Sequence, residues 1–136
     1  MPAKDNYHDS VVHALIKDGW TITNEQFPVR IAERRLWIDI RAIKNNGDSI
    51  ILVEVKSFNP GQSMVEALAN ALGQYMLYIA ALKYLQDDTA ILVLAIPAVA
   101  YDGIFSEAIG ETVQSTFDLK LVVYDPDTEE IVKWIL

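Results

Sequence analysis

The sequence predicts an α/β fold in which helices flank a mixed central β-sheet. Segments with apolar residues at helical spacing alternate with β-branched runs in the order αβββαβαββ. A long helix leads into a near-continuous apolar run, which indicates a crossover connection and a strand buried on both faces. The 136 residues, of which 51% are hydrophobic, suffice for one core, so we expect a single domain over residues 1–136.

Turn and capping signals divide the chain into these elements. Asp5 or Asn6 is placed to cap the first helix, and Gly19 to end it in a left-handed conformation. Ser63 and Glu66 form a capping box at the start of the long helix. The predicted elements are a helix over 5–18, strands over 20–23, 36–44 and 49–57, a helix over 63–85, a strand over 89–97, a helix over 103–116, and strands over 119–125 and 131–136.

Composition excludes several classes of protein. The chain has no cysteine, which removes disulfide frameworks, thiolate zinc sites and cysteine nucleophiles. Its apolar runs are shorter than the ~20 residues that span a bilayer, and no export signal opens it, so we expect a cytoplasmic protein without membrane contact. The 19 acidic and 11 basic residues give a net charge of −8, which opposes tight, non-specific binding to nucleic acid.

The predicted hairpin brings two carboxylates together. If Asn46-Gly47 forms a two-residue turn, Asn45 faces Asp48, and the same register places Asp39 opposite Glu54. Facing carboxylates, with Cβ atoms about 5 Å apart, destabilise a sheet unless a positive group lies between them. Because side chains alternate along strands, one face carries Trp37, Asp39, Arg41, Leu52, Glu54 and Lys56, and the other, expected to be core, carries Ile38, Ile40, Val53 and Val55.

A divalent cation is the obvious occupant of this site. Two carboxylates offer hard oxygen ligands, which suit Mg²⁺ or Mn²⁺ and make zinc a poor match. Lys56 projects from the same face, where it could hold an attacking water or stabilise charge that grows on a phosphate. The alternative is a solvated ladder of cross-strand charge pairs, made by the same two acids with Arg41 and Lys56. The apolar character of both strands favours the metal site, because buried paired acids are costly without a function.

Asp39, followed fifteen residues later by Glu54-Val55-Lys56, resembles the sparse motif of the PD-(D/E)XK nuclease superfamily, with Ile38 in place of the proline. This resemblance implies a restriction-endonuclease-like (PD-(D/E)XK) core that hydrolyses DNA phosphodiester bonds. It implies that Asp39, Glu54 and the backbone carbonyl of Val55 bind the metal. It also implies that Lys56 assists the hydrolytic water.

The same resemblance extends the site to two helices. The acid of the superfamily's first helix matches Asp9, and the Gln-x-x-x-Tyr of its resolvase-like branches matches Gln74 and Tyr78, one turn apart on one helix face. Each match has a second interpretation. Asp9 would also stabilise the helix dipole, and Gln74 with Tyr78 could instead satisfy buried backbone groups. His8 and His13 are too few and too far apart in helical angle to bind a metal together, so we expect a surface or capping role for each.

Over essentially its whole length the chain is similar to the cyanobacterial XisH family. The similarity is carried by PAKD at 2–5, YHD at 7–9, ALIKDGWTIT at 14–23, IDI at 38–40, VEVKSF at 53–58 and ALGQY at 71–75. Members are called fdxN element excision controlling factors, a name that links them to programmed DNA excision in heterocyst-forming cells. They often pair with a small XisI-like partner. The resemblance implies either an active endonuclease or a catalytically silent nuclease fold that acts with a XisI-like subunit or an excision recombinase.

Partner binding is the least specified property. Basic residues between the first strand and the hairpin predict a positive rim that can touch DNA, with a solvated loop as the alternative. The net charge predicts DNA binding that is weak, salt-sensitive and dependent on metal or a partner. A homodimer is compatible with the apolar content, without a named interface. An unrelated α/β ligand-binding domain would require the two acids to lie on opposite faces. The basic residues are Arg30, Arg34, Arg35, Arg41 and Lys44, with Lys56 beside them.

Overall fold

The computed structural model describes residues 6–136, which form one six-stranded mixed β-sheet. The PAKD segment at 2–5, including the predicted cap Asp5, lies outside the described residues. The strands follow one another across the sheet in chain order; the β3–β4 and β4–β5 pairs are parallel and the other pairs antiparallel. They are β1 (Thr21–Ile31), β2 (Arg34–Lys44), β3 (Ser49–Val55), β4 (Ile91–Pro97), β5 (Leu121–Asp125) and β6 (Glu130–Ile135).

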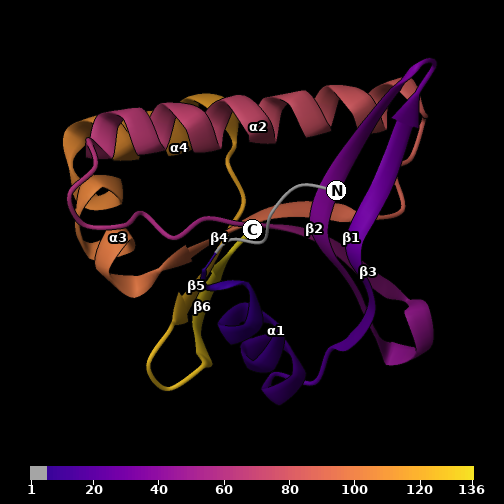
Figure 1. Cartoon of the computed structure of the whole chain (residues 1–136), viewed down its shortest axis with the longest axis horizontal. Coiled ribbons are helices and arrows are strands. Elements are labelled where there is room, and N and C mark those ends of the chain that lie inside the picture. The colour runs from indigo at the N-terminus through magenta and orange to yellow at the C-terminus, as the bar shows by residue number, and fades with distance from the viewer. Residues whose placement is uncertain (1–5) are drawn as a thin grey trace.

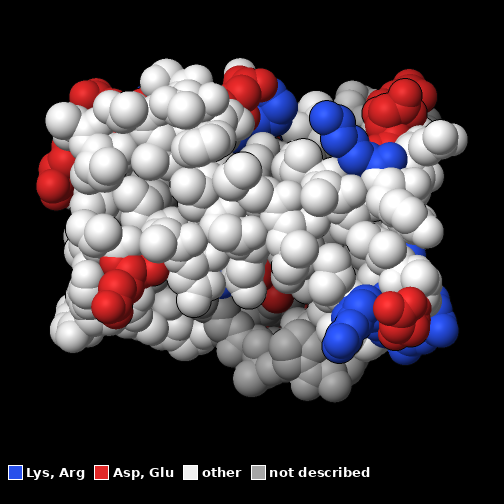
Figure 2. Space-filling view, turned by 90° about the horizontal axis from the view of Figure 1, so that it is seen from above, with Lys and Arg blue, Asp and Glu red and all other residues white. Residues whose placement is uncertain are grey.

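Helices cover both faces of this sheet, which confirms the predicted α/β class. In Figure 1, α1 lies below the sheet, while α2 and α4 lie side by side above it. Seen from above, the layer of α2 and α4 carries its charged residues mainly toward the edges (Figure 2). None of the described helices combines the length and the hydropathy that crossing a bilayer requires. The helices are α1 (His8–Lys17), α2 (Met64–Tyr84), α3 (Ala98–Asp102) and α4 (Ala108–Phe117), with 3-10 turns η1 (Asn45–Gly47) and η2 (Ile104–Ser106).

Two hydrophobic cores fill the spaces between the sheet and its helices. Val11 and Leu15 of α1 pack on one face, and Leu68 and Ala71 of α2 pack on the other. Strand β4 contributes to both cores, as its apolar run predicts. Its side chains alternate, with Leu92, Leu94 and Ile96 on the α2 side and Val93 and Ala95 on the α1 side.

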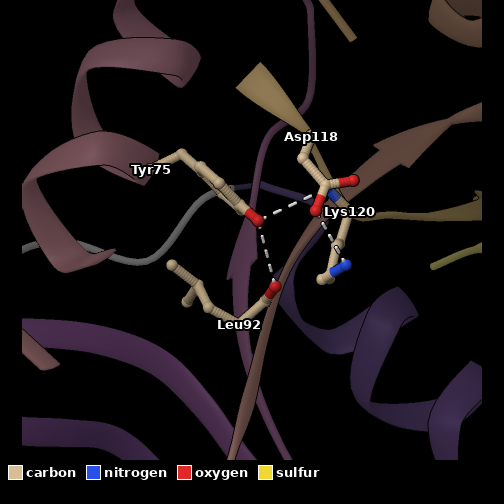
Figure 3. A network of polar contacts seen from close by, with 4 residues as sticks. All are labelled: Tyr75, Leu92, Asp118 and Lys120. Atoms are coloured by element: carbon tan, nitrogen blue, oxygen red, sulfur yellow. Dashed lines mark hydrogen bonds and ion pairs between the residues drawn. The ribbon is translucent and has the colours of Figure 1, made fainter. Parts of the chain in front are cut away.

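Tyr75 ties α2 to the sheet. Its hydroxyl donates to the Leu92 carbonyl at 3.4 Å and accepts from the Lys120 amide at 3.3 Å (Figure 3). At the start of α2, the Ser63 hydroxyl accepts from the Glu66 amide at 3.2 Å, which confirms the predicted cap. The Tyr75 bonds fix the middle of α2 over the sheet, and the cap only closes the helix's first turn.

The first two elements have different boundaries from those predicted. Helix α1 begins at His8, and the Asn6 side chain does not cap it. The side-chain nitrogen of Asn6 donates instead to Asn59 Oδ1 at 3.3 Å. Gly19 does take the left-handed conformation, with φ of 96°. Strand β1 continues eight residues beyond the predicted end, through Pro28 to Ile31. An edge strand tolerates proline, because the missing amide faces no partner strand.

The helix predicted over 103–116 is divided in the structure. The chain turns at Gly103, passes through η2 and begins α4 at Ala108. Gly110 of α4 packs directly on the backbone of Ile104 and Phe105, and a Cβ at that position would clash with both. The predicted order of elements is otherwise confirmed, with α3 as one addition.

Candidate functional site

The register of the β2–β3 hairpin is the predicted one. Ile40 pairs with Val53 and Lys44 with Ser49, the same offset that places Asp39 opposite Glu54. The connection differs, because residues 45–48 form a four-residue loop in which both Asn45 and Asn46 have φ of 56°. The register is unaffected, since the longer loop is centred on the same point of the chain.

The alternation of β2 breaks at Asp39, which corrects the predicted core face. Ile40 packs in the α1-side core, as expected, but Ile38 packs in the α2-side core. Strand β1, the other neighbour of β2, is also irregular here. Its residue Gln26 lies between the paired residues Glu25 and Phe27 and has φ of 62°. On β2, side chains two residues apart, Ile38 and Ile40, therefore point to different faces at this level.

Asp39 uses this irregular position to reach β3. Its carboxylate is 8% exposed and accepts a hydrogen bond from the Val55 amide at 2.7 Å. The side chain thus supplies the acceptor for an amide that lies just beyond the regular β2–β3 pairing. Burial raises the pKa of Asp39, and the Val55 hydrogen bond and the charge of His8 partly offset this effect.

Glu54 and Lys56 complete the arrangement. Glu54 is 5% exposed, and one of its oxygens, Oε2, lies 3.8 Å from the Lys56 ammonium. The other oxygen, Oε1, is buried and has no hydrogen-bond partner among the described residues. Burial and then the negative charge of Asp39 raise the pKa of Glu54 to about 8. The structure therefore brings Asp39, Glu54 and Lys56 together at one end of β3.

The donor set fits a hard divalent cation. Two acids that share a buried site cannot both ionise cheaply, and here Glu54 responds by holding its proton to about pH 8. A cation would replace that proton, and the unpartnered Oε1 oxygen would become one of its ligands. Asp39 and Glu54 would be its ligands, with the Val55 carbonyl expected from the motif.

The raised pKa of Glu54 predicts how metal-free stability depends on pH. The unfolded carboxyl has a pKa of about 4.5 and the folded one about 8, so this group's stabilising contribution is full below pH 4.5 and is lost as the pH rises through 8. The free energy of unfolding should fall over this window by up to about 1.4 kcal/mol per pH unit. Urea unfolding in EDTA at pH 5 to 8 measures it. Glu54→Gln should flatten the dependence, and parallel curves for both proteins would contradict the pKa.

Helix α2 faces the carboxylate pair with Tyr78. Its hydroxyl donates to the Trp37 carbonyl of β2 at 2.9 Å, so it satisfies a backbone group. Burial and then the charges of Glu54 and Asp39 raise the pKa of Tyr78, which shows that it also lies near the site. Gln74, one turn earlier, is half-buried, and its buried Oε1 atom has no hydrogen-bond partner within residues 6–136. A supporting role for Gln74 stays a prediction.

Helix α1 contributes His8, which corrects the expected surface or capping role. The His8 ring is 1% exposed, and its Nε2 atom lies 2.8 Å from Glu25 Oε1 of β1. The charge of His8 acts on Asp39, so the ring lies near the site. Asp9 is exposed and groups with His8 and Glu25, their ligand atoms lying within 4.8 Å of one another; Asp39 and Glu54 are not in this group. His13 lies at the surface, 3.1 Å from Glu129, as expected.

Two site residues, Glu25 and Gln26, were not predicted, and His8 was expected in another role. Glu25 and Gln26 lie in the part of β1 that was not predicted as strand. Gln26 is 8% exposed, and neither of its amide atoms has a partner among the described residues. The clue was the apolar, alternating run from Phe27 to Ile31, which marks a longer strand.

A pocket of about 450 Å³ opens beside Lys56. It lies between the end of β3 and the first turns of α2, and its volume is in the range of small-ligand sites. Most of its polar lining is neutral amide and hydroxyl groups, which can bind phosphate or base edges without adding charge. The polar lining residues include Lys56, Asn59, Gln62, Ser63 and Asn70, and Glu66 is the one acidic residue of the lining among the described residues.

The predicted basic rim is not one cluster. Lys44 lies 3.7 Å from Asp18 and stacks over Trp20 at the turn end of the hairpin, the far end of β3 from Lys56. Arg41 donates to the Thr23 hydroxyl at 2.9 Å. The remaining basic residues, Arg30, Arg34 and Arg35, flank the β1–β2 turn.

Fold and site together define a mixed α/β protein that carries a buried carboxylate pair and a lysine at the carboxyl end of β3, inside its central sheet. The chain belongs to the XisH family, whose model, described as XisH protein, matches residues 1–132. It is similar to an XisH family protein from Nostoc punctiforme PCC 73102, whose crystal structure has 33% identity and a TM-score of 0.88 and covers 97% of this chain and 100% of that chain.

A second crystal structure is equally similar. It is of a fdxN element excision controlling factor protein from Anabaena variabilis, with 33% identity and a TM-score of 0.90, and it covers 98% of this chain and 100% of that chain. No curated protein matches the sequence.

Proposed function

We propose that this protein is a Mg²⁺- or Mn²⁺-dependent endonuclease that hydrolyses DNA phosphodiester bonds in the excision of a DNA element. The observation that carries the proposal is the buried Asp39–Glu54 pair with the Lys56 ammonium 3.8 Å from Glu54. The motif of these residues resembles that of PD-(D/E)XK nucleases. The description of the A. variabilis relative as an excision controlling factor supports DNA as the substrate class.

Each residue has its own role in the proposed reaction. Asp39 and Glu54 hold the cation, which neutralises charge on the phosphate and polarises its oxygen when bound. Lys56 lies between Glu54 and the 450 Å³ pocket, so its ammonium orients the water and offsets negative charge that grows on the phosphate. The water oxygen forms a bond to phosphorus as the bond to the leaving sugar oxygen breaks; the water gives its proton to solvent, and the leaving oxygen takes one from solvent. Gln74 and Asp9 are expected to support the site.

The pocket gives the DNA strand a place beside Lys56. Asn59, Gln62 and Asn70 offer amide groups that can donate to phosphate oxygens or pair with base edges. With a net charge of −8, the protein gains little from long-range attraction to DNA, so contacts of this kind and the cation carry the binding. The expected affinity is weak and salt-sensitive.

A catalytically silent regulatory protein is the second candidate, and the burial of both acids favours it. Asp39 and Glu54 are 8% and 5% exposed, and Lys56 already lies against Glu54. Buried residues of this kind can be kept for the stability of the fold, without a role in catalysis. Such a protein would act through a XisI-like subunit or an excision recombinase, and it would form a stable complex without metal-dependent turnover.

A cleavage assay with a Lys56 variant separates the two candidates. We expect the purified protein to cleave duplex or four-way-junction DNA in the presence of Mg²⁺. Addition of EDTA should stop this cleavage. Lys56→Met should lower kcat about 10²- to 10³-fold and leave Mn²⁺ affinity nearly unchanged, because the lysine stabilises developing charge and binds no metal. Lys133→Met, at an exposed lysine of β6, is the matched control. Mn²⁺ binding without cleavage of any DNA would support the silent protein.

A further inference from the structure

Helix α2 is apolar on both sides: on the face that packs on the sheet and on its outer face. Among its 21 residues only Glu66 and Lys83 are charged, and they lie near opposite ends. Figure 2, which looks onto this face, shows a broad uncharged area over α2 and α4. The large apolar side chains exposed on α2 are Val65 (60%), Met76 (45%), Leu77 (54%), Ile79 (37%) and Tyr84 (65%).

One row of exposed residues on α2, which includes Met76, has the spacing of a two-helix seam. Positions 66, 69, 73, 76, 80 and 83 are all exposed and are separated alternately by three and four residues. The middle of this seam carries small side chains, Ala69, Gly73 and Ala80, with Met76 between them. A seam of this form lets a second helix approach closely.

Gly73 has no evident role within the chain itself. Glycine in a helix interior costs about 1 kcal/mol relative to alanine, and Gly73 does not take a positive φ. A Cβ built there would meet nothing within 4 Å among the described residues. The missing side chain therefore serves neither the turn geometry nor the packing of this protomer, and it leaves room for a neighbouring backbone.

We infer that the outer face of α2 binds the same face of a second copy of this chain, with the two α2 helices antiparallel. The seam is self-complementary about its midpoint, as a two-fold interface requires. Glu66 then faces the partner's Lys83. Ala69 faces the partner's Ala80, and Gly73 faces the partner's Met76.

Charge favours a second copy in this direction. Antiparallel helices place opposite charges together at both ends of the seam, whereas parallel helices would place Glu66 against Glu66 and Lys83 against Lys83. A stable interface takes roughly 800 Å² from each partner, about a tenth of this protein's 7449 Å² surface. Helix α2 is about 30 Å long. A groove of about 300 Å³ between Met76, Ile79 and Phe117 widens the surface toward α4.

Light scattering coupled to size exclusion tests this proposal on the full chain. Wild type should have twice the 15.3 kDa mass of one chain. Gly73→Arg should raise the dissociation constant at least about tenfold with an unchanged circular dichroism spectrum, because the position is exposed and arginine favours helix. Ile16→Arg changes an equally exposed apolar residue on α1 and should remain dimeric. A monomeric wild type, or a Gly73→Arg protein with the dissociation constant of wild type over a dilution series, would overturn the proposal.

Two further variants test the antiparallel register. Glu66→Lys and Lys83→Glu should each weaken the dimer, and the double exchange should restore it. Because the chain has no cysteine, an Ala69→Cys/Ala80→Cys protein should form disulfide-linked dimers on oxidation. Efficient cross-linking by Ala69→Cys alone would place the helices parallel and contradict the register.

Discussion

Glu54→Ala is expected to abolish Mg²⁺-dependent DNA cleavage, with a loss of at least about 10³-fold in rate. The substitution removes one of two proposed metal ligands and the carboxylate against which Lys56 is positioned. It also removes a buried acid whose pKa is raised to about 8 by burial and then by the charge of Asp39. The fold should therefore survive at the pH of the assay, and the lost rate can be assigned to the site.

The control for this variant is a glutamate that is exposed and remote from β3. Glu111→Ala, on the outer surface of α4, should retain wild-type activity. Circular dichroism and a urea midpoint near that of wild type would show that Glu54→Ala is folded. Unchanged cleavage by a folded Glu54→Ala protein would refute the assignment of this site.

Asp39→Asn should remove Mn²⁺ binding, with an affinity loss of more than about 100-fold. Outer-shell partners of a metal are worth about 10- to 100-fold, and Asp39 is a proposed direct ligand. The asparagine oxygen can still accept from the Val55 amide at the position where Asp39 accepts at 2.7 Å, so β2 and β3 stay joined. Titration calorimetry measures the effect. For wild type, the enthalpy of Mn²⁺ binding should depend on the ionisation heat of the buffer below pH 8. This dependence would show that binding releases the proton held by Glu54.

An exposed aspartate of the same hairpin supplies the control. Asp48→Asn changes the same functional group in the loop between β2 and β3 and should bind Mn²⁺ as wild type does. If Asp39→Asn binds as tightly as Asp48→Asn, the carboxylate pair is not the metal site. Absence of binding in wild type as well would favour the silent regulatory protein.

The hairpin was predictable because its determinants are local. Asn46 and Gly47 favour a turn at one point of the chain, and the β-branched runs on both sides set the register. That register alone brings Asp39 and Glu54 together. The break in alternation at Asp39 was not predictable from β2 itself, because it arises opposite Gln26, whose positive φ belongs to the neighbouring strand.

The contribution of β1 and α1 to the site was missed for the same reason. Residues 24–28 contain polar side chains and a proline, which are unfavourable for a central strand but acceptable in an edge strand with one neighbour. Without β1 in place, no partner could be assigned to His8. In the structure, Glu25 provides that partner and burial makes His8 part of the site.

A crystal soaked in Mn²⁺ and measured at the manganese absorption edge tests the central claim most directly. We predict an anomalous peak within 2.0 to 2.5 Å of carboxylate oxygens of both Asp39 and Glu54, about the distance of oxygen ligands to such cations. The Lys56 ammonium should move away from Glu54 toward the pocket. A peak confined to His8, Asp9 and Glu25, or no peak at saturating Mn²⁺, would contradict the account.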